Sequence, residues 1–119
     1  MRSLVVKVTC GGEDAERCNQ GFTVAATAVA AGAEVSLWLT GEAAWLGVPG
    51  RAEQFALPLA TPLADLLGAV LAGGRVTVCT QCAARRGIEA DGVRTGVRIA
   101  GAAAFTEEVL RDGVQALVY

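Results

Sequence analysis

The sequence predicts a single α/β domain in which helices cover both faces of a parallel sheet. Five short apolar segments recur along the chain, and helix-like stretches lie between them. Several of these segments are near-continuous runs of aliphatic and β-branched residues, as expected for parallel strands covered on both faces. Because strand and helix alternate, the connections should be right-handed crossovers. A chain of 119 residues has room for one core of this kind, so we expect residues 1–119 to form a single three-layer domain.

The five apolar segments are the predicted strands, and the first, third and fifth are the most continuously apolar. They lie at residues 3–9, 33–40, 75–79, 96–100 and 115–119. A flavodoxin-like sheet would place them in the order 2-1-3-4-5.

The first predicted helix spans residues 14–31. Asp14 is suited to cap its first turn and Gly32 to end it. Phe22 lies on the apolar stripe of this helix, and Cys18 falls on the same stripe. We therefore expect the Cys18 side chain to face the core.

The remaining helices follow the same kind of signals. Thr61 and Pro62 are suited to begin a second helix that ends near Gly73 and Gly74. A short helix should follow Cys79, and another should occupy about residues 103–111.

Residues 41–60 show the least periodicity but include large apolar side chains such as Trp45, Leu46 and Phe55. These side chains would either tuck under a loop or form a subunit interface or a lid.

The composition limits the possible functions. A formal charge of −2 and a pI near 5.0 provide no basic surface, so we expect no direct nucleic-acid partner and no membrane partner. No apolar run approaches the ~20 residues that span a bilayer, and the first residues do not form a secretory signal. We therefore expect a cytoplasmic protein. Histidine is absent, which removes the commonest general base and the commonest non-sulfur zinc ligand. We expect no metal and no cofactor.

The segment VTVCTQCAARRGIE carries the clearest chemical signal. Cys79 ends a predicted strand just before a helix, where unpaired backbone N–H groups favour a thiolate. Cys82 follows three residues later. Arg85 and Arg86 lie about two turns further on, where they would orient an anionic partner or form a solvated face.

A second candidate site is a crevice at Cys10, Gly11 and Glu42. In the order 2-1-3-4-5 the strands that end at Cys10 and Cys79 are neighbours, so the two thiols would share this crevice. Gly11 and Gly12 could hold an anion with backbone N–H groups, but their spacing matches no phosphate loop or dinucleotide fingerprint. A plain turn is the simpler interpretation of the glycine pair.

Four interpretations of the cysteines remain open. A structural zinc site normally needs two close ligand pairs, whereas only Cys79 and Cys82 form one. A thioredoxin-type dithiol matches this CxxC, but all three prolines precede the motif instead of following it. A sulfur carrier needs one activated cysteine and neither a general base nor a metal. The fourth interpretation is that both thiols are small buried apolar groups.

Several segments together resemble the DsrE/DsrF-like family, which includes subunits of a sulfur relay that thiolates tRNA. The resemblance covers nearly the whole chain and is carried by LVVKVTCGGEDAERC, AAGAEVSLWLTGEA, VTVCTQCAARRGI, VRIAGAAAF and ALVY. It implies a five-stranded parallel sheet flanked by helices and places the persulfide-bearing cysteine of the family at Cys79. It also implies a homotrimer or homohexamer, to which residues 41–60 would contribute, and partner proteins that donate and accept sulfur.

The resulting hypothesis is a sulfurtransferase-like carrier that holds a persulfide on Cys79. Cys82 would tune that thiolate, resolve the persulfide or form a reversible disulfide with Cys79. Two alternatives stay open, a CxxC thiol-disulfide redox protein and a non-catalytic oligomeric binding module with a ligand near Cys10, Glu42 and Cys79. Accessibility of the Cys79 thiol separates the binding module from the other two functions.

Overall fold

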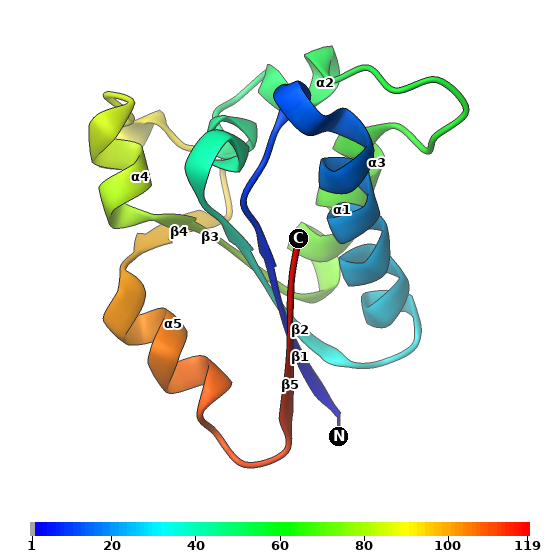
Figure 1. Ribbon diagram of the computed structural model, residues 1–119, viewed down its shortest axis with the longest axis vertical. Helices are drawn as coiled ribbons and strands as arrows, with labels where there is room; N and C mark the ends of the chain where they lie inside the picture. Colours follow the sequence, from blue (N-terminus) through cyan, green and yellow to red (C-terminus); the bar gives the residue numbers. More distant parts are fainter. Residues whose placement is uncertain (1) are drawn as a thin grey trace.

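The computed structural model describes residues 2–119 as a three-layer sandwich around a five-stranded parallel sheet (Figure 1). The strands are β1 (Ser3–Val8), β2 (Glu34–Leu39), β3 (Arg75–Cys79), β4 (Val97–Ala100) and β5 (Val114–Val118). All five predicted strands are therefore confirmed to within a residue or so. Every neighbouring pair runs parallel, as the alternation of strand and helix predicted.

The predicted strand order is wrong. The observed order is β4-β3-β2-β1-β5, so β2 lies between β1 and β3. The strands β1, β2, β3 and β4 follow one another across the sheet in the order of the chain. After β4 the chain returns to the opposite edge of the sheet, where β5 pairs with β1. Hydrogen bonds from the Tyr119 N–H to the Lys7 carbonyl and from the Thr9 N–H to the Tyr119 carbonyl, both 2.8 Å long, extend this pairing beyond β5.

Helices cover the two faces of the sheet unequally. They are α1 (Ala15–Ala30), α2 (Arg51–Gln54), α3 (Leu63–Gly73), α4 (Thr80–Arg85) and α5 (Ala102–Val109), with short 3-10 helices η1 (Gly12–Asp14), η2 (Gly41–Gly47) and η3 (Ala90–Gly92). Figure 1 shows α1 and α3 side by side on one face and α5 on the other. We call these the α1/α3 face and the α5 face.

The predicted helix ends are confirmed, but two predicted caps are not. Gly32 follows α1 with φ +89°, a conformation that glycine adopts without strain. The Asp14 side chain makes no capping hydrogen bond and lies 3.4 Å from Arg17 instead. Pro62 takes the capping position of α3 without a side-chain cap, while the Thr61 carbonyl accepts a hydrogen bond from Asn19.

The α1/α3 face holds the apolar core. Alternate residues of β1, β2 and β3 point into it, and Phe22 and Cys18 of α1 are completely buried there. The core side chains with no measurable exposure include Val6, Val8, Phe22, Leu37, Leu39, Leu67, Val70, Val76 and Val78. The predicted inward orientation of Cys18 is thus confirmed.

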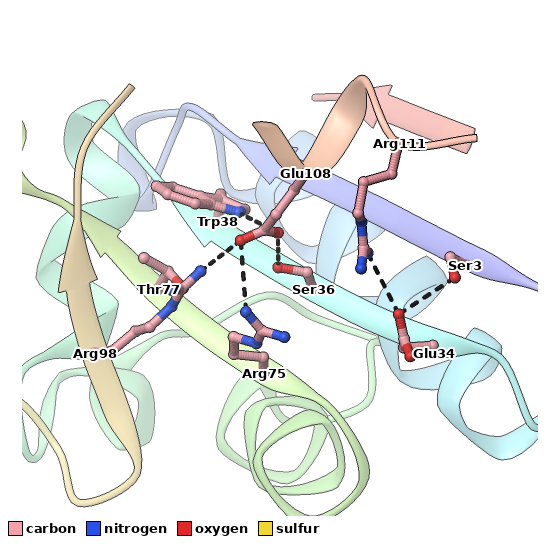
Figure 2. A network of polar contacts seen from close by, with 9 residues as sticks. All are labelled: Ser3, Glu34, Ser36, Trp38, Arg75, Thr77, Arg98, Glu108 and Arg111. Atoms are coloured by element: carbon pink, nitrogen blue, oxygen red, sulfur yellow. Dashed lines mark hydrogen bonds and ion pairs between the residues drawn. The ribbon is translucent and has the colours of Figure 1, made fainter. Parts of the chain in front are cut away.

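The α5 face is polar where α5 covers it. None of the residues of α5 is fully buried, and Glu108 attaches the helix to the sheet (Figure 2). The Glu108 carboxylate accepts hydrogen bonds from Ser36, Trp38 and Arg98, which lie on β2 and β4. A side chain that is 12% exposed therefore connects three elements through charge and hydrogen bonds.

The edge strand β5 departs from the prediction. The run QALVY was expected to be covered on both faces, but β5 has only β1 beside it, and its residues from Gln115 onward are exposed. Leu117 is 41% exposed and Val118 is 64% exposed. A continuous apolar run, which predicted a strand covered on both faces, thus lies at an exposed edge of the sheet.

Residues 41–60 lie mainly against the domain. Leu46, Ala43 and Ala52 are buried, and Trp45 and Phe55 are half-buried. This agrees with the first of the two interpretations, in which the apolar side chains tuck under a loop.

Within residues 2–119, none of the helices combines the length and the apolar character needed to cross a lipid bilayer.

Candidate functional site

Cys79 is the most accessible of the four cysteines. It is the last residue of β3, directly before α4, and its side chain is half-buried, whereas the other three cysteines are buried. All four thiols are free. Strand alternation places Cys79 on the α5 face together with Thr77, and its half-buried side chain packs at the border of the apolar core.

The surroundings of Cys79 favour its thiolate. Partial burial acts to raise the pKa of the thiol, but the backbone N–H groups of Cys82 and Gln81, the Cys82 thiol and the Lys7 ammonium lower it more. The pKa of Cys79 is consequently below its ordinary value of 9.0. Because the side chain is only half-buried, the sulfur is also accessible.

Cys82 is held in place by the chain that leaves β2. The backbone N–H of Gly41 donates to Cys82 Sγ over 3.2 Å. Gly41 has φ +53°, and a Cβ there would lie 2.5 Å from the carbonyl oxygen of Thr9. Only glycine fits this position, which fixes the donor and thereby the buried Cys82 thiol beneath Cys79.

The two arginines of the motif have different environments. Arg86 donates from Nε and Nη2 to Glu42 Oε2, over 3.0 and 2.8 Å, and from Nη1 to the carbonyl of Cys82. Its side chain is only 19% exposed. Arg85 is exposed, with no ion pair to any of residues 2–119. The Arg86–Glu42 pair therefore ties α4 to η2, and Arg85 is the arginine open to a partner.

The predicted meeting of Cys10 and Cys79 does not occur. Because β2 lies between β1 and β3, the two residues follow non-adjacent strands. Cys10 is 5% exposed and belongs to the core cluster of the α1/α3 face, which Cys79 only borders. Burial and the nearby Asp14 and Glu13 raise the pKa of Cys10, and burial raises that of Cys18 to about 12.

Gly11 and Glu42 do lie together. A Cβ on Gly11 would be 2.9 Å from the Glu42 carbonyl oxygen, so the two segments are in backbone contact. They border an open groove of about 290 Å³ whose other walls include Trp45, Arg51 and Phe55. Arg51 stacks 4.4 Å from the centre of the Trp45 ring. This groove is separate from Cys79, which does not line it.

Lys7 was missed as a site residue, although the sequence contained the signal. It interrupts the apolar run of β1 and is the only lysine in the chain. In the structure it lies on the α5 face, with Nζ 4.9 Å from the centre of the Phe105 ring. A lone cation in the middle of a covered strand marks a position where packing alone does not explain the residue.

Metal ligands do not gather in the part of the chain that the structure describes. Among residues 2–119, no three histidine, cysteine, aspartate or glutamate side chains are arranged to hold a metal ion. The CxxC pair thus has no further ligand beside it.

The chain matches one protein-family model and is similar in structure to several solved proteins. The model of the DsrE/DsrF-like family matches residues 3–118. The crystal structure of the ychN protein from E. coli is similar with a TM-score of 0.83 and 18% identity over the full length of both chains. The MTH1491 protein of unknown function from Methanobacterium thermoautotrophicum has a TM-score of 0.71 and 10% identity, again over both full chains. The conserved protein BT1422 from Bacteroides thetaiotaomicron has a TM-score of 0.61 and 16% identity, covering 98% of this chain and 94% of its own. No curated protein matches.

Proposed function

Because this chain belongs to the DsrE/DsrF-like family, we propose that it is a sulfur carrier that holds a persulfide on Cys79 and passes the sulfur to a protein partner. The observation that carries the proposal is the contrast among the cysteines. Only Cys79 is both accessible and surrounded by groups that favour its thiolate. A thiolate is the reactive form of cysteine, so this residue is the nucleophile of the chain.

The proposed reaction consists of two thiolate displacements. First, the Cys79 thiolate attacks the terminal sulfur of a donor persulfide. A new S–S bond forms on Cys79, the S–S bond of the donor breaks, and the donor leaves as a thiolate. Second, the thiolate of an acceptor attacks the outer sulfur on Cys79 and releases Cys79 as a thiolate. Electrons balance at each step, so no oxidant, metal or cofactor is needed.

Cys82 has three candidate roles, and its contacts favour the tuning of the Cys79 thiolate. It would tune the Cys79 thiolate, resolve the persulfide or form a disulfide with Cys79. The Cys82 sulfur is buried and accepts the Gly41 N–H, while its thiol lowers the pKa of Cys79. These interactions fit a Cys82 thiol that donates a hydrogen bond to the Cys79 sulfur better than a Cys82 thiolate that attacks the persulfide.

Arg85 is the proposed docking residue for an acidic partner, and Arg86 is structural. Arg85→Glu should slow sulfur transfer between proteins but leave loading from polysulfide unchanged. Arg86→Glu should impair both, because it removes the Glu42 pair that holds α4. Equal losses in both assays for Arg85→Glu would contradict this division.

Assembly as a homotrimer or homohexamer is part of the proposal. The exposed apolar side chains lie mostly on the C-terminal edge, where Leu110 is 76% exposed and the neighbouring residues of β5 are also open. This edge is our preferred contact between copies, while residues 41–60, most of whose apolar side chains are covered, contribute the fully exposed Leu59. Light scattering coupled to gel filtration would give the number of subunits.

The test of the carrier function is intact-protein mass spectrometry. Reduced wild-type, Cys79→Ser and Cys82→Ser proteins are incubated with polysulfide, or with a cysteine desulfurase and cysteine. One added sulfur atom that Cys79→Ser alone abolishes supports the carrier. If an accessible, reduced Cys79 gains no sulfur, the carrier function is wrong. In that case a Cys79–Cys82 disulfide that forms readily would favour the redox protein, and otherwise the groove beside Glu42 would favour the binding module.

A further inference from the structure

Lys7 is a cation without a counter-ion. Its half-buried side chain has no acidic or hydrogen-bonding partner among residues 2–119. Removing an ammonium group from water costs free energy unless another group compensates it. Lys7 is the single lysine of the chain, and the other nine cationic side chains are arginines. An anion that forms near this position would therefore interact favourably with Lys7.

Strand register places Lys7 and Cys79 on the same face. Lys7 is level with Trp38 on β2, and Trp38 is level with Thr77 on β3, two residues before Cys79. Standard strand spacing gives a separation of about 12 Å between the Cα atoms of Lys7 and Cys79. The flexible four-carbon stem of lysine spans roughly half of this distance, which brings the ammonium within a Debye length of the sulfur.

Phe105 fixes the direction of the lysine. The ammonium lies over the Phe105 ring, and this ring packs edge-on against Trp38 with 5.3 Å between centres and an angle of 84°. Phe105 lies on α5, which begins two residues after Ala100, the β4 residue level with Cys79. The aromatic pair thus holds the ammonium on the part of the α5 face that leads to Cys79.

The other charged groups on this face are already engaged. The Glu108 carboxylate bonds Ser36, Trp38 and Arg98, and lies 3.7 Å from Arg75. Glu107 is exposed on α5, and Arg85 is exposed at the far end of α4. The Tyr119 carbonyl oxygen beside β1 is taken by Thr9. Apart from the exposed Glu107, Cys79 is the group on this face whose anion has no cationic partner in contact among residues 2–119, although the backbone N–H groups of Gln81 and Cys82 favour its thiolate.

We propose that Lys7 is the counter-ion of the Cys79 site and stabilises the anionic sulfur, both as the thiolate and as the persulfide. Its effect on the persulfide rests on the carrier function proposed above, whereas its effect on the thiolate does not. The Lys7 ammonium acts on the Cys79 sulfur through its charge, across the Phe105 and Trp38 rings and without direct contact. The favourable influence of its charge on the Cys79 thiol agrees with this role.

The experiment compares wild type with Lys7→Met, Lys7→Arg and Arg17→Met. Lys7→Met keeps the length of the stem but removes the charge, and Lys7→Arg restores the charge. Arg17→Met removes an equally positive, exposed charge from α1 on the other face. Alkylation of Cys79 is followed by peptide mass spectrometry across a pH series, which separates it from the other three thiols. Circular dichroism establishes that each variant is folded.

Lys7→Met should raise the apparent pKa of Cys79 and slow its alkylation at neutral pH roughly three- to tenfold. Lys7→Arg should recover most of the rate, Arg17→Met should match wild type, and added salt should narrow the gap between Lys7→Met and wild type. An unchanged pH profile in folded Lys7→Met overturns the proposal, as does an equal shift in Arg17→Met. Polysulfide loading is measured in parallel. If wild type fails to gain sulfur while Lys7→Met still shifts the profile, the carrier function fails and the role of Lys7 stands.

Discussion

The two faces of the sheet are built on different principles. The α1/α3 face is a closed apolar layer in which Phe22 and the alternate strand residues have no exposed surface. The α5 face carries Trp38 and a charged network around Glu108 (Figure 2), and Lys7 on β1 and Cys79 on β3 belong to the same face. Burial of apolar area is the larger source of stability. The first face can therefore supply most of the folding free energy, which leaves the second free to carry polar and reactive groups.

The largest contrast should come from removing one phenylalanine from each face. Phe22→Ala should lower the free energy of unfolding by about 3–5 kcal/mol, because it leaves a cavity in a closed core. Phe105→Ala should cost only about 1–2 kcal/mol, because the ring is half-buried and its main contact is the Trp38 edge. Urea titrations of both variants measure the difference. Equal losses would show that the two faces are equally closed.

A smaller effect should follow from neutralising Glu108. Glu108→Gln should reduce stability by about 1–3 kcal/mol, because Arg98 loses its charged partner and the Ser36 and Trp38 donors lose a carboxylate acceptor. Glu107→Gln, one residue earlier on the exposed side of α5, is the matched control and should stay within about 0.5 kcal/mol of wild type. If the two substitutions cost the same, the network does not anchor α5.

The same carboxylate predicts a dependence on pH. Burial acts to raise the pKa of Glu108, but hydrogen bonds from Ser36 and Trp38 and the charge of Arg98 hold it below its ordinary value of 4.5. A pKa lowered by folding stabilises the native state above the unfolded pKa, and that stability is lost as the pH falls through the folded pKa. The stability gap between wild type and Glu108→Gln should therefore be constant near neutral pH and shrink below pH 4.5. Urea midpoints from pH 7 to pH 3 check this, and a gap that widens in acid would contradict it.

The smallest effect should come from the rim of the network. Arg111 and Glu34 are 3.4 Å apart, and each side chain is about half exposed. Such a pair is screened by water and salt, so Arg111→Gln should change the free energy of unfolding by no more than about 0.5 kcal/mol. Thermal unfolding at low and high salt measures it. A loss as large as that of Glu108→Gln would mean that the network acts as one unit.

Local patterns were enough to predict most of the elements. Apolar runs and helical periodicity located all five strands and the long helices, and the core position of Cys18 followed from the same period as Phe22. Neither side-chain cap forms, because the Asp14 carboxylate lies beside Arg17 and because α3 begins one residue later than expected, with Pro62 at the capping position. Capping depends on competing contacts that the sequence does not show.

The candidate site was predicted only in its local part. Cys79, Cys82 and the two arginines are adjacent in sequence, so the strand-to-helix junction was visible without a structure. Lys7 lies 72 positions before Cys79 and joins it only through strand register across β2. Arg86 was expected to orient an anionic partner or to lie in a solvated face, and its contact with Glu42, which follows β2, could not be seen because the two residues are far apart in the chain.

The sequence by itself determined the class of fold, the family resemblance and the position of the candidate cysteine at the end of β3, because each depends on residues close together in the chain. Only the tertiary structure decided the strand order, and with it the separation of Cys10 from Cys79 and the approach of Lys7. The physical reason is that the order 2-1-3-4-5 and the observed order use the same strands and helices. They differ in two pairings, because β3 lies beside β2 instead of β1 and β5 lies beside β1 instead of β4, and both pairings are decided by long-range packing and hydrogen bonding.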